Sequence, residues 1–323
     1  MAACGPDSTH GRVEGKLEGI NQADILVYVE DSVSGDPGRV DTITIKRGKF
    51  SYDREVHEPA IVTFLYPNFS TTTLVMHPGG TVKLKGDANR LSEIEVDGNE
   101  DNLLLTEFRQ RTNGKADVEV HREAATFIRS HAASQAAIVL FRECFANAEQ
   151  IEQNPTESLL KELVKAQPKH PVVLSMERRL KPLLQCHTGA MLPAFSSTDT
   201  DGKAVSSADY KGKPLLIVFC AQWDGGFYQM KRTARDLRNQ ITSDRLAMLF
   251  ISLDAEKENI VRANSYDPLP GKIIFDGKSL QSPLVRTLGM RYVNGNLLVD
   301  RNGKIIARDI PVDQWTDRIQ ALL

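Results

Sequence analysis

The stretch FCAQWDGGFYQM, residues 219–230, decides how the fold is interpreted. An apolar run at residues 215–219 leads into it, and an apolar run without alternation is typical of a strand buried on both faces of a sheet. Trp223 and a pair of glycines follow, and the sequence then takes on helical periodicity. This order predicts a strand, a tight turn and a helix within an α/β sheet.

The remainder of the last third continues the alternation of strand and helix patterns. Apolar runs at residues 246–253, 272–276 and 296–300 are separated by segments with helical spacing. The dipeptide Asn302-Gly303 lies between two apolar runs and predicts a hairpin. A helical pattern closes the chain, so we expect a sheet with helices on both of its faces.

The first third has a different pattern. Residues 11–98 contain short alternating strands separated by turn residues, which predicts a small β-sandwich. Residues 99–187 show helical spacing and are expected to form a helical spacer. With residues 1–10 as a tether and residues 188–323 as the last domain, the predicted fold class is multidomain α+β.

Composition excludes several classes of function. The chain has 323 residues and a formal net charge of −2, so it lacks the basic surface that nucleic acid requires. No apolar run approaches the ~20 residues of a membrane helix. The four cysteines contain no C-x-x-C pair, and the histidines show no metal-ligand spacing, so neither a metal nor a cofactor is expected.

The N-terminal sequence Met1-Ala2-Ala3-Cys4 resembles the end of a bacterial lipoprotein signal, in which small residues precede the cysteine that is lipidated. This resemblance implies a lipid anchor at Cys4 as the protein's contact with a membrane. It also implies localisation in the bacterial cell envelope.

Two further resemblances are carried by longer segments. LPAFSSTDTDGKAVSSADYKGKPLLIVFCAQW (192–223), FISLDAEKEN (250–259) and NLLVDRNGKII (296–306) together resemble the TlpA/ResA-like, AhpC/TSA-related branch of the thioredoxin-like superfamily. VDTITIKRGKFSY (40–52) and LVMHPGGTVKLKGD (74–87) are similar to an uncharacterised β-domain that precedes thioredoxin-like domains in bacterial envelope lipoproteins. The resemblance implies a thioredoxin fold from about Gly189 to the C-terminus, and thiol–disulfide chemistry.

The residues on which that family's chemistry depends are absent. Asp224 stands where the resemblance places the attacking cysteine, and Phe227 stands at the position of its resolving partner. Asn294 occupies the position of the family's cis-proline. Asp is a preferred helix cap, so we expect Asp224 to cap the following helix. Phe227 begins a stripe with helical core spacing, so we expect it to be packed inward.

Some candidate sites remain. Cys220 and Cys186 are weak redox candidates, because a cysteine in an apolar run is more often a buried small hydrophobe. A Cys144–Cys186 disulfide is an open alternative in an oxidising compartment. A candidate binding cleft lies where α/β folds bind ligands, at the ends of the strands. Its expected residues are Trp223, Asp224, Gly225, Gly226 and Asn294.

Two hypotheses of function follow. In the first, the protein is a non-catalytic thioredoxin-like module that binds a protein, peptide or small molecule, and its former dithiol site has become structural. In the second, it is a thiol–disulfide oxidoreductase or a peroxidase-like protein that uses Cys220 or Cys186. The sequence favours the first because both cysteines and the proline are lost together.

Overall fold

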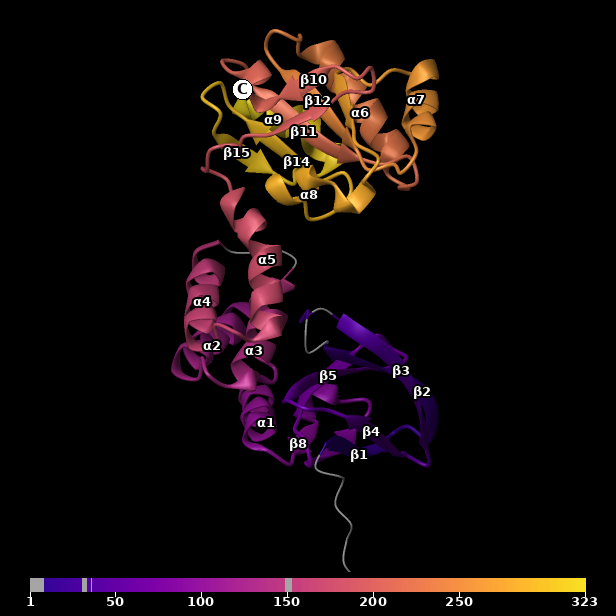
Figure 1. The fold of residues 1–323 in the computed structure, drawn as a ribbon, viewed down its shortest axis with the longest axis vertical. Helices are drawn as coiled ribbons and strands as arrows, with labels where there is room; N and C mark the ends of the chain where they lie inside the picture. The colour runs from indigo at the N-terminus through magenta and orange to yellow at the C-terminus, as the bar shows by residue number, and fades with distance from the viewer. Residues whose placement is uncertain (1–8, 31–33, 36, 149–152) are drawn as a thin grey trace, which may run out of the picture. The chain divides into compact units, whose positions relative to one another are not determined.

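The computed structural model describes residues 9–30, 34–35, 37–148 and 153–323. The chain divides into two compact units, and their boundary lies within one helix, where the first unit ends at Arg178 and the second begins at Arg179. Figure 1 follows the elements of both units along the chain. The predicted lipidation site, Cys4, lies outside the described residues.

The described part of the first unit begins with strands that form one mixed sheet in the order β6-β5-β2-β3-β4-β1-β7-β8. These strands are β1 (His10–Glu18), β2 (Gln22–Glu30), β3 (Pro37–Lys46), β4 (Lys49–Glu55), β5 (Ala60–Leu65), β6 (Thr71–Met76), β7 (Thr81–Asp87) and β8 (Glu95–Asp97). β3 and β4 are joined through a single residue pair, Lys46 with Lys49. The sheet therefore consists of two four-stranded halves connected at one hairpin.

The two halves of the sheet share a hydrophobic core, as the predicted sandwich requires. Phe50 on β4 and Phe64 on β5 belong to different halves, and their ring centroids are 5.5 Å apart. Tyr52 of β4 also meets Phe64, edge to face at 6.3 Å. Strands from both halves contribute fully buried residues to this core, including Val13, Ile25 and Leu84. The alternating pattern of residues 11–98 thus buries one side of each half.

Helix α1 (Glu100–Thr112) satisfies both edge strands of the sheet with its own side chains. Asn102 is fully buried, and its amide accepts a hydrogen bond from the Val75 N–H and donates one to the Val75 carbonyl, both at 2.8 Å. One turn later, Thr106 makes the equivalent pair of bonds with Val96 of β8, at 3.0 and 2.9 Å. The unpaired N–H and C=O groups of an edge strand can pair with another chain and cause aggregation. Helix α1 forms hydrogen bonds with such groups on both edge strands.

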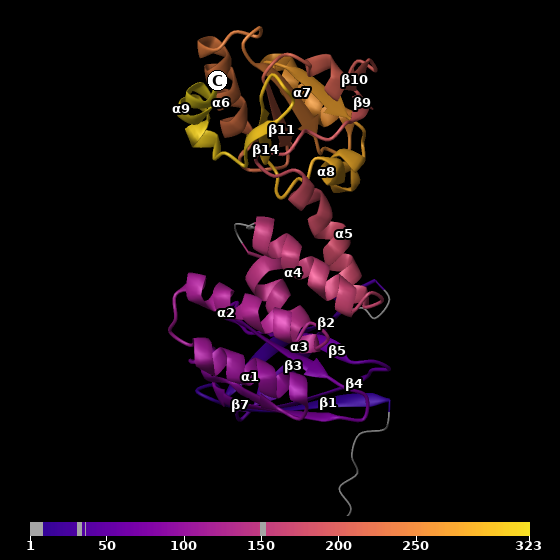
Figure 2. The ribbon, with the colours of Figure 1, turned by 90° about the vertical axis from the view of Figure 1, so that its left-hand side faces the viewer.

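The remaining helices of the spacer region are α2 (Asp117–Ser130), α3 (Gln135–Phe141), α4 (Gln153–Ala166) and α5 (Pro171–Gln185). A π-helical segment, Arg142–Ala146, continues α3. Figure 2 shows α1 next to the strands of the first unit and α2, α3 and α4 stacked beyond it. The helices from α1 to the first half of α5 therefore belong to the same compact unit as the β-sandwich.

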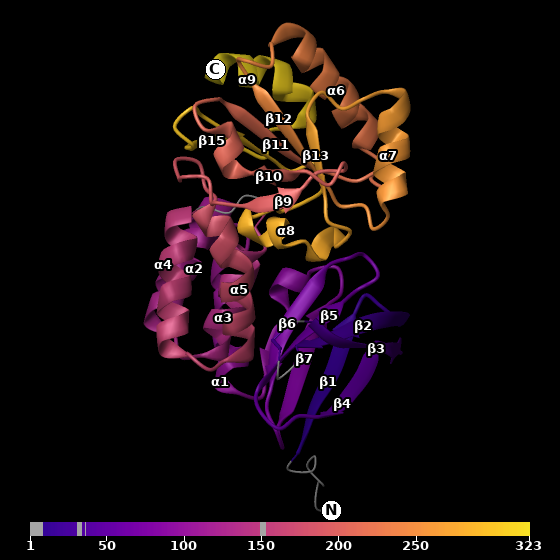
Figure 3. The ribbon, with the colours of Figure 1, turned by 45° about the horizontal axis from the view of Figure 1, so that its top comes forward.

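The second unit contains a five-stranded sheet in the order β13-β12-β11-β14-β15. Its strands are β11 (Leu215–Cys220), β12 (Ala247–Ser252), β13 (Lys272–Phe275), β14 (Asn296–Val299) and β15 (Ile305–Arg308), and a two-stranded ribbon is formed by β9 (Ser196–Thr198) and β10 (Ala204–Ser206). Its helices are α6 (Phe227–Gln240), α7 (Lys257–Tyr266), α8 (Pro283–Thr287) and α9 (Trp315–Leu322). Figure 3 shows α6 and α9 on one face of the sheet and α8 on the other.

The central strand β11 is buried on both faces, and its side chains divide between two cores. Leu216, Val218 and Cys220 pack with α6 and α9. Leu215, Ile217 and Phe219 pack with α8 and the chain around Cys186. β11 runs parallel to β12 and antiparallel to β14, the mixed pattern of a thioredoxin fold. The predicted fold class is confirmed. Among the described residues no helix has both the length and the apolar character needed to cross a bilayer.

We predict that Asn102→Ala destabilises the first unit by about 1–3 kcal/mol, because the buried N–H of Val75 loses its partner. The Val75 carbonyl keeps a hydrogen bond from Asn99 at 2.9 Å. Urea unfolding followed by far-UV circular dichroism measures the change. Leu103→Ala on the exposed face of α1 is the control and should change stability by less than about 0.5 kcal/mol. Equal effects of the two variants would contradict this role for Asn102.

A second prediction concerns the core beneath α6. Phe227 is 0 % exposed, as are Met230, Ala234 and Leu237 along the same predicted stripe. Phe227→Ala should therefore cost about 3–5 kcal/mol through the cavity that it leaves. Both tryptophans, Trp223 and Trp315, lie in this unit, so tryptophan fluorescence in urea reports its unfolding selectively. Tyr228→Ala, which removes a neighbouring ring that is 61 % exposed, is the matched control. A loss below about 1 kcal/mol for Phe227→Ala would refute the core assignment.

Candidate functional site

A buried carboxylate, that of Asp254, anchors the start of the loop between β11 and α6. Asp254, just beyond β12, is 1 % exposed, and its Oδ1 accepts a hydrogen bond from the Gln222 N–H at 3.0 Å. Its Oδ2 accepts one from the Ser252 hydroxyl at 2.8 Å. The ends of the two parallel strands are thereby tied together, and the loop that follows Cys220 begins from a fixed point.

Asp224 and Asn294, which lie 70 residues apart in sequence, meet at the tip of this loop. The Asn294 side-chain amide donates a hydrogen bond to Asp224 Oδ2 at 2.6 Å. The same oxygen accepts the Gly226 backbone N–H at 2.8 Å. Asp224 and Asn294, which the sequence resemblance assigns to the positions of an attacking cysteine and a cis-proline, are therefore joined by a direct polar contact.

The prediction that Asp224 caps the helix is wrong, because another residue occupies the N-cap position of α6. The cap residue of α6 is Gly226, and no side chain accepts a hydrogen bond in the capping position. The reason is the pair of glycines, which delays the start of the helix to Phe227, so that Asp224 lies two residues before the cap. Its carboxylate still accepts one backbone N–H of the turn, from Gly226 itself.

Of the two glycines, only Gly226 is required by close packing. A Cβ on Gly226 would come within 2.8 Å of Asn294 Nδ2 and 3.0 Å of Asp224 Oδ2, which is closer than real Cβ atoms normally approach. A Cβ on Gly225 would meet nothing within 4 Å. Gly226 therefore leaves the space in which the Asp224–Asn294 hydrogen bond forms.

The backbone at Asn294 is incompatible with proline. Its φ is +65°, a conformation that asparagine tolerates and that proline cannot adopt. Its N–H donates a hydrogen bond to the Phe219 carbonyl at 2.8 Å, and Phe219 donates to the Gly295 carbonyl at 3.0 Å. The described residues contain no cis peptide bond. The segment around Asn294 instead continues the pairing with β11.

The three cysteines of the described residues are free thiols, so the alternative of a Cys144–Cys186 disulfide is not observed. Cys220 and Cys186 are both 0 % exposed. Cys220 packs in the core on the α6 face of the sheet, and Cys186 packs in the core on the α8 face. The sheet therefore separates the two redox candidates.

The electrostatic environment of these thiols disfavours the reactive thiolate. Burial raises the pKa of Cys220 far above its usual range, and the Asp254 carboxylate adds to the shift. Burial also raises the pKa of Cys186 to about 11, partly offset by the positive charge of Arg308. The Cys186 thiol donates a hydrogen bond to the Thr287 carbonyl at 3.3 Å. Burial, with Glu143 as a smaller cause, raises the pKa of Cys144 to about 12.

The residues of the predicted cleft come together, but they form an open surface around the Asp224–Asn294 contact. Trp223 is 58 % exposed, Gly225 is exposed, and Asp224, Gly226 and Asn294 are half-buried. Among the described residues, no group of three or more His, Cys, Asp or Glu could hold a metal ion.

Sequence reasoning missed three residues of this region. Tyr228 is 61 % exposed at the start of α6, and Tyr292, two residues before Asn294, is 50 % exposed. Helical periodicity could have identified Tyr228, because Phe227 and Met230 lie on the buried stripe of α6 and Tyr228 lies outside that stripe. Asp254 gave no signal of its role, since its partner Gln222 is distant in sequence.

Comparisons with known proteins agree with this architecture. A model of the AhpC/TSA family matches residues 188–308, and a model of a domain of unknown function, DUF4369, matches residues 12–105. A search of curated proteins gave no match.

Three solved structures from Bacteroides are similar to the chain. One is the C-terminal domain of a protein described as a thiol-disulfide oxidoreductase from Bacteroides thetaiotaomicron, 25 % identical over 42 % of this chain and 96 % of that one, with a TM-score of 0.39. A thiol-disulfide oxidoreductase from Bacteroides fragilis is 29 % identical over 41 % and 99 %, with a TM-score of 0.39. A thioredoxin-like protein from Bacteroides caccae is 12 % identical over 63 % and 78 %, with a TM-score of 0.49. The two family models identify residues 188–308 of the present chain as a thioredoxin-like AhpC/TSA domain and residues 12–105 as a DUF4369 domain.

Proposed function

We propose that this protein is a non-catalytic member of the thioredoxin-like thiol-disulfide oxidoreductase family, and that the face around Trp223 binds an extended peptide or protein segment. One observation carries the proposal: Asp224 and Asn294, at the positions of the attacking cysteine and the cis-proline, are joined by a 2.6 Å hydrogen bond. A carboxylate has no redox chemistry, and this one already has two hydrogen-bond donors.

The buried thiols support the non-catalytic part of the proposal. A thiol–disulfide exchange needs a thiolate that can reach the disulfide of its substrate. With a pKa of about 11, only about one Cys186 thiol in a thousand is ionised at pH 8. Cys220 is fully enclosed, and an anion there would lie near the Asp254 carboxylate.

The exposed aromatic residues support the binding part of the proposal. Trp223, Tyr228 and Tyr292 flank the Asp224–Asn294 contact in the chain, and each is at least half exposed. Tryptophan and tyrosine are enriched in protein interfaces, where a rigid ring buries a large area at low entropic cost.

The proposal extends to a cell-envelope location through a lipid on Cys4. Palmitate labelling of cells that express the wild-type chain or Cys4→Ala would test this part of the proposal.

We expect the purified protein not to accelerate the reduction of insulin by dithiothreitol, and Cys220→Ser to behave identically. A thioredoxin assayed in parallel is the positive control. Iodoacetamide at pH 8 should modify Cys186 and Cys220 only after the protein is unfolded, because both side chains are 0 % exposed and burial raises the pKa of both thiols. Acceleration that Cys220→Ser abolishes would establish the redox alternative and exclude our proposal.

The binding face can be tested by selecting peptides from a displayed random library on the wild-type protein. Enriched peptides should lose about tenfold or more in affinity on Trp223→Ala, which corresponds to about 1.4 kcal/mol. Tyr266→Ala on α7 is the control, since Tyr266 is 91 % exposed and lies on another element. Peptides that bind the wild type and Trp223→Ala equally would place the binding surface elsewhere.

A further inference from the structure

Lysines on neighbouring strands of the first unit form a continuous row across the sheet. Lys46 on β3 is paired with Lys49 on β4. On β1, Lys16 is paired with Lys49 on one side and with Lys85 of β7 on the other. Residues directly opposite one another in a sheet point to the same face, and all four side chains are exposed. These four residues, the lysine row, therefore run across the strands on the outer face of the sheet.

The lysine row brings like charges together. Like charges that lie directly opposite in neighbouring strands destabilise a sheet, and Lys16 has such a neighbour on both sides. Within the part of the chain that the structure describes, none of the four lysines forms an ion pair with a carboxylate. By contrast, Arg12, earlier on β1, pairs with Asp53 at 3.1 Å. The repulsion within the row is therefore not relieved by ion pairs of these lysines, and an external polyanion would relieve it.

The hairpin between β3 and β4 adds another positive charge beside the row. Arg47 and Gly48 form its two-residue loop, with φ values of +51° and +72°. Such a loop requires positive φ at both positions, where asparagine and glycine are the usual residues. The side chain of Arg47 is exposed. The loop thus places a cation, at a position where a bulky side chain is uncommon, between the two strands that carry Lys46 and Lys49.

The carboxylates of this face lie beside the lysine row or at its end. Glu14 and Glu18 are two residues before and two residues after Lys16 on β1, so they share its face. Glu95 on β8 is opposite Lys85 and ends the row. A broad anionic surface, such as a membrane, would meet these carboxylates together with the lysines and would be repelled by them. The pattern therefore fits a linear polyanion that lies along the row.

The spacing of the row indicates which linear polyanion fits it. Neighbouring strands are about 4.8 Å apart, so the lysines recur at about that interval. In an extended peptide the side chains on one face recur at every second residue, about 6.6 Å apart, and an acidic peptide would fall out of step with the row. A pyranose ring in an extended 1,4-linked chain advances by about one strand spacing. A polysaccharide with one carboxylate on each sugar thus presents its charges in step with the lysines.

We propose that the lysine row binds a linear acidic polysaccharide, with successive sugar carboxylates placed against successive lysines. The inference does not rest on the function proposed for the Trp223 face. The two sites lie in different units, so the failure of either proposal leaves the other unchanged.

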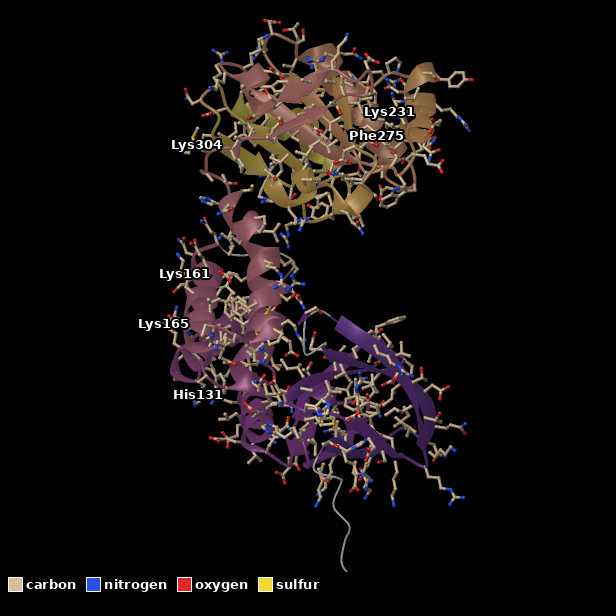
Figure 4. All side chains as sticks on the ribbon, viewed as in Figure 1. His131, Lys161, Lys165, Lys231, Phe275 and Lys304 are labelled. Carbon is tan, nitrogen blue, oxygen red and sulfur yellow. The ribbon has the colours of Figure 1, made fainter. Side chains whose placement is uncertain are left out.

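Fluorescence anisotropy of an end-labelled hexamer of β-1,4-linked mannuronate, titrated with the full chain, tests the proposal. Binding should be saturable at about 0.01 M ionic strength, where the Debye length is about 30 Å, and weaker at about 0.15 M, where it is about 8 Å. Lys16→Gln/Lys49→Gln should lose about fivefold or more in affinity, because two exposed ion pairs to the ligand are removed. The control is Lys161→Gln/Lys165→Gln, two exposed lysines of α4 labelled in Figure 4, and it should stay within about twofold of the wild type.

Urea unfolding followed by far-UV circular dichroism shows whether the unliganded Lys16→Gln/Lys49→Gln is folded. Its unfolding midpoint should equal or exceed that of the wild type, because the substitutions remove contacts between like charges. A lower midpoint would contradict the repulsion from which the inference starts. If the double variant does not fold, Lys85→Gln should lower the affinity for hexamannuronate, and an unchanged affinity there would count against the proposal.

Four further results would overturn the inference. The first is the absence of saturable binding of hexamannuronate, and the second is equal binding of cellohexaose, which has the same linkage and no charge. The third is an unchanged affinity in a folded Lys16→Gln/Lys49→Gln. The fourth is tighter binding of hexaglutamate, of a single-stranded oligonucleotide or of phosphatidylglycerol vesicles than of hexamannuronate, since each would assign the row to another class of partner.

Discussion

The second unit depends on one constraint, the burial of β11 on both faces. Because successive side chains of a strand point to opposite sides, residues 215–220 supply two separate hydrophobic cores. The α6 side takes Cys220, and the α8 side takes Phe219. The loop that leaves this strand is thereby fixed at its base, and any thiol within the strand is removed from solvent. Cys220 is a core residue because β11 is the central strand and is covered on both faces.

The loop at the end of β11 is held by a set of hydrogen bonds that depend on one another. The amide of Asn294 reaches Asp224 only because Gly226 has no Cβ in the space between them. Asn294 is itself held by its backbone N–H, which donates to the Phe219 carbonyl of β11. The carboxylate of Asp224, the missing Cβ of Gly226 and the amide of Asn294 therefore depend on one another, and a change in one disrupts the contacts of the other two.

The first unit shows a similar reliance on buried polar side chains. Asn102 and Thr106 are one helical turn apart on α1, and they pair with Val75 and Val96 on the two edge strands of the sheet. Their spacing places both on one face of the helix. These four hydrogen bonds add no apolar burial, yet together they position α1 against both edges. The helices that follow extend from this fixed element, which is consistent with their joining the β-sandwich in one compact unit.

Periodicity predicted the elements that bury apolar residues, and it did not predict contacts between polar residues that are far apart in sequence. The buried stripe from Phe227 to Ile241 followed from helical spacing, and the alternation of residues 11–98 gave the strands of the sandwich. The family resemblance singles out Asn294, but its hydrogen bond to Asp224 spans 70 residues, and no local pattern encodes that distance. The displaced helix start had a local signal in Gly225-Gly226. The turn that two glycines favour outweighs the preference of Asp for capping positions.

These dependencies determine what a single substitution toward a dithiol site would do to the structure. A cysteine at position 224 would remove the acceptor of two hydrogen bonds and would have no partner, because position 227 points into the core. A cysteine at position 227 would leave a cavity beneath α6 and would be buried there. A proline at position 294 could neither adopt φ +65° nor donate to the Phe219 carbonyl. Each of these substitutions is therefore destabilising on its own, and only a concerted change of all three positions, with repacking of the core under α6, would build a dithiol site.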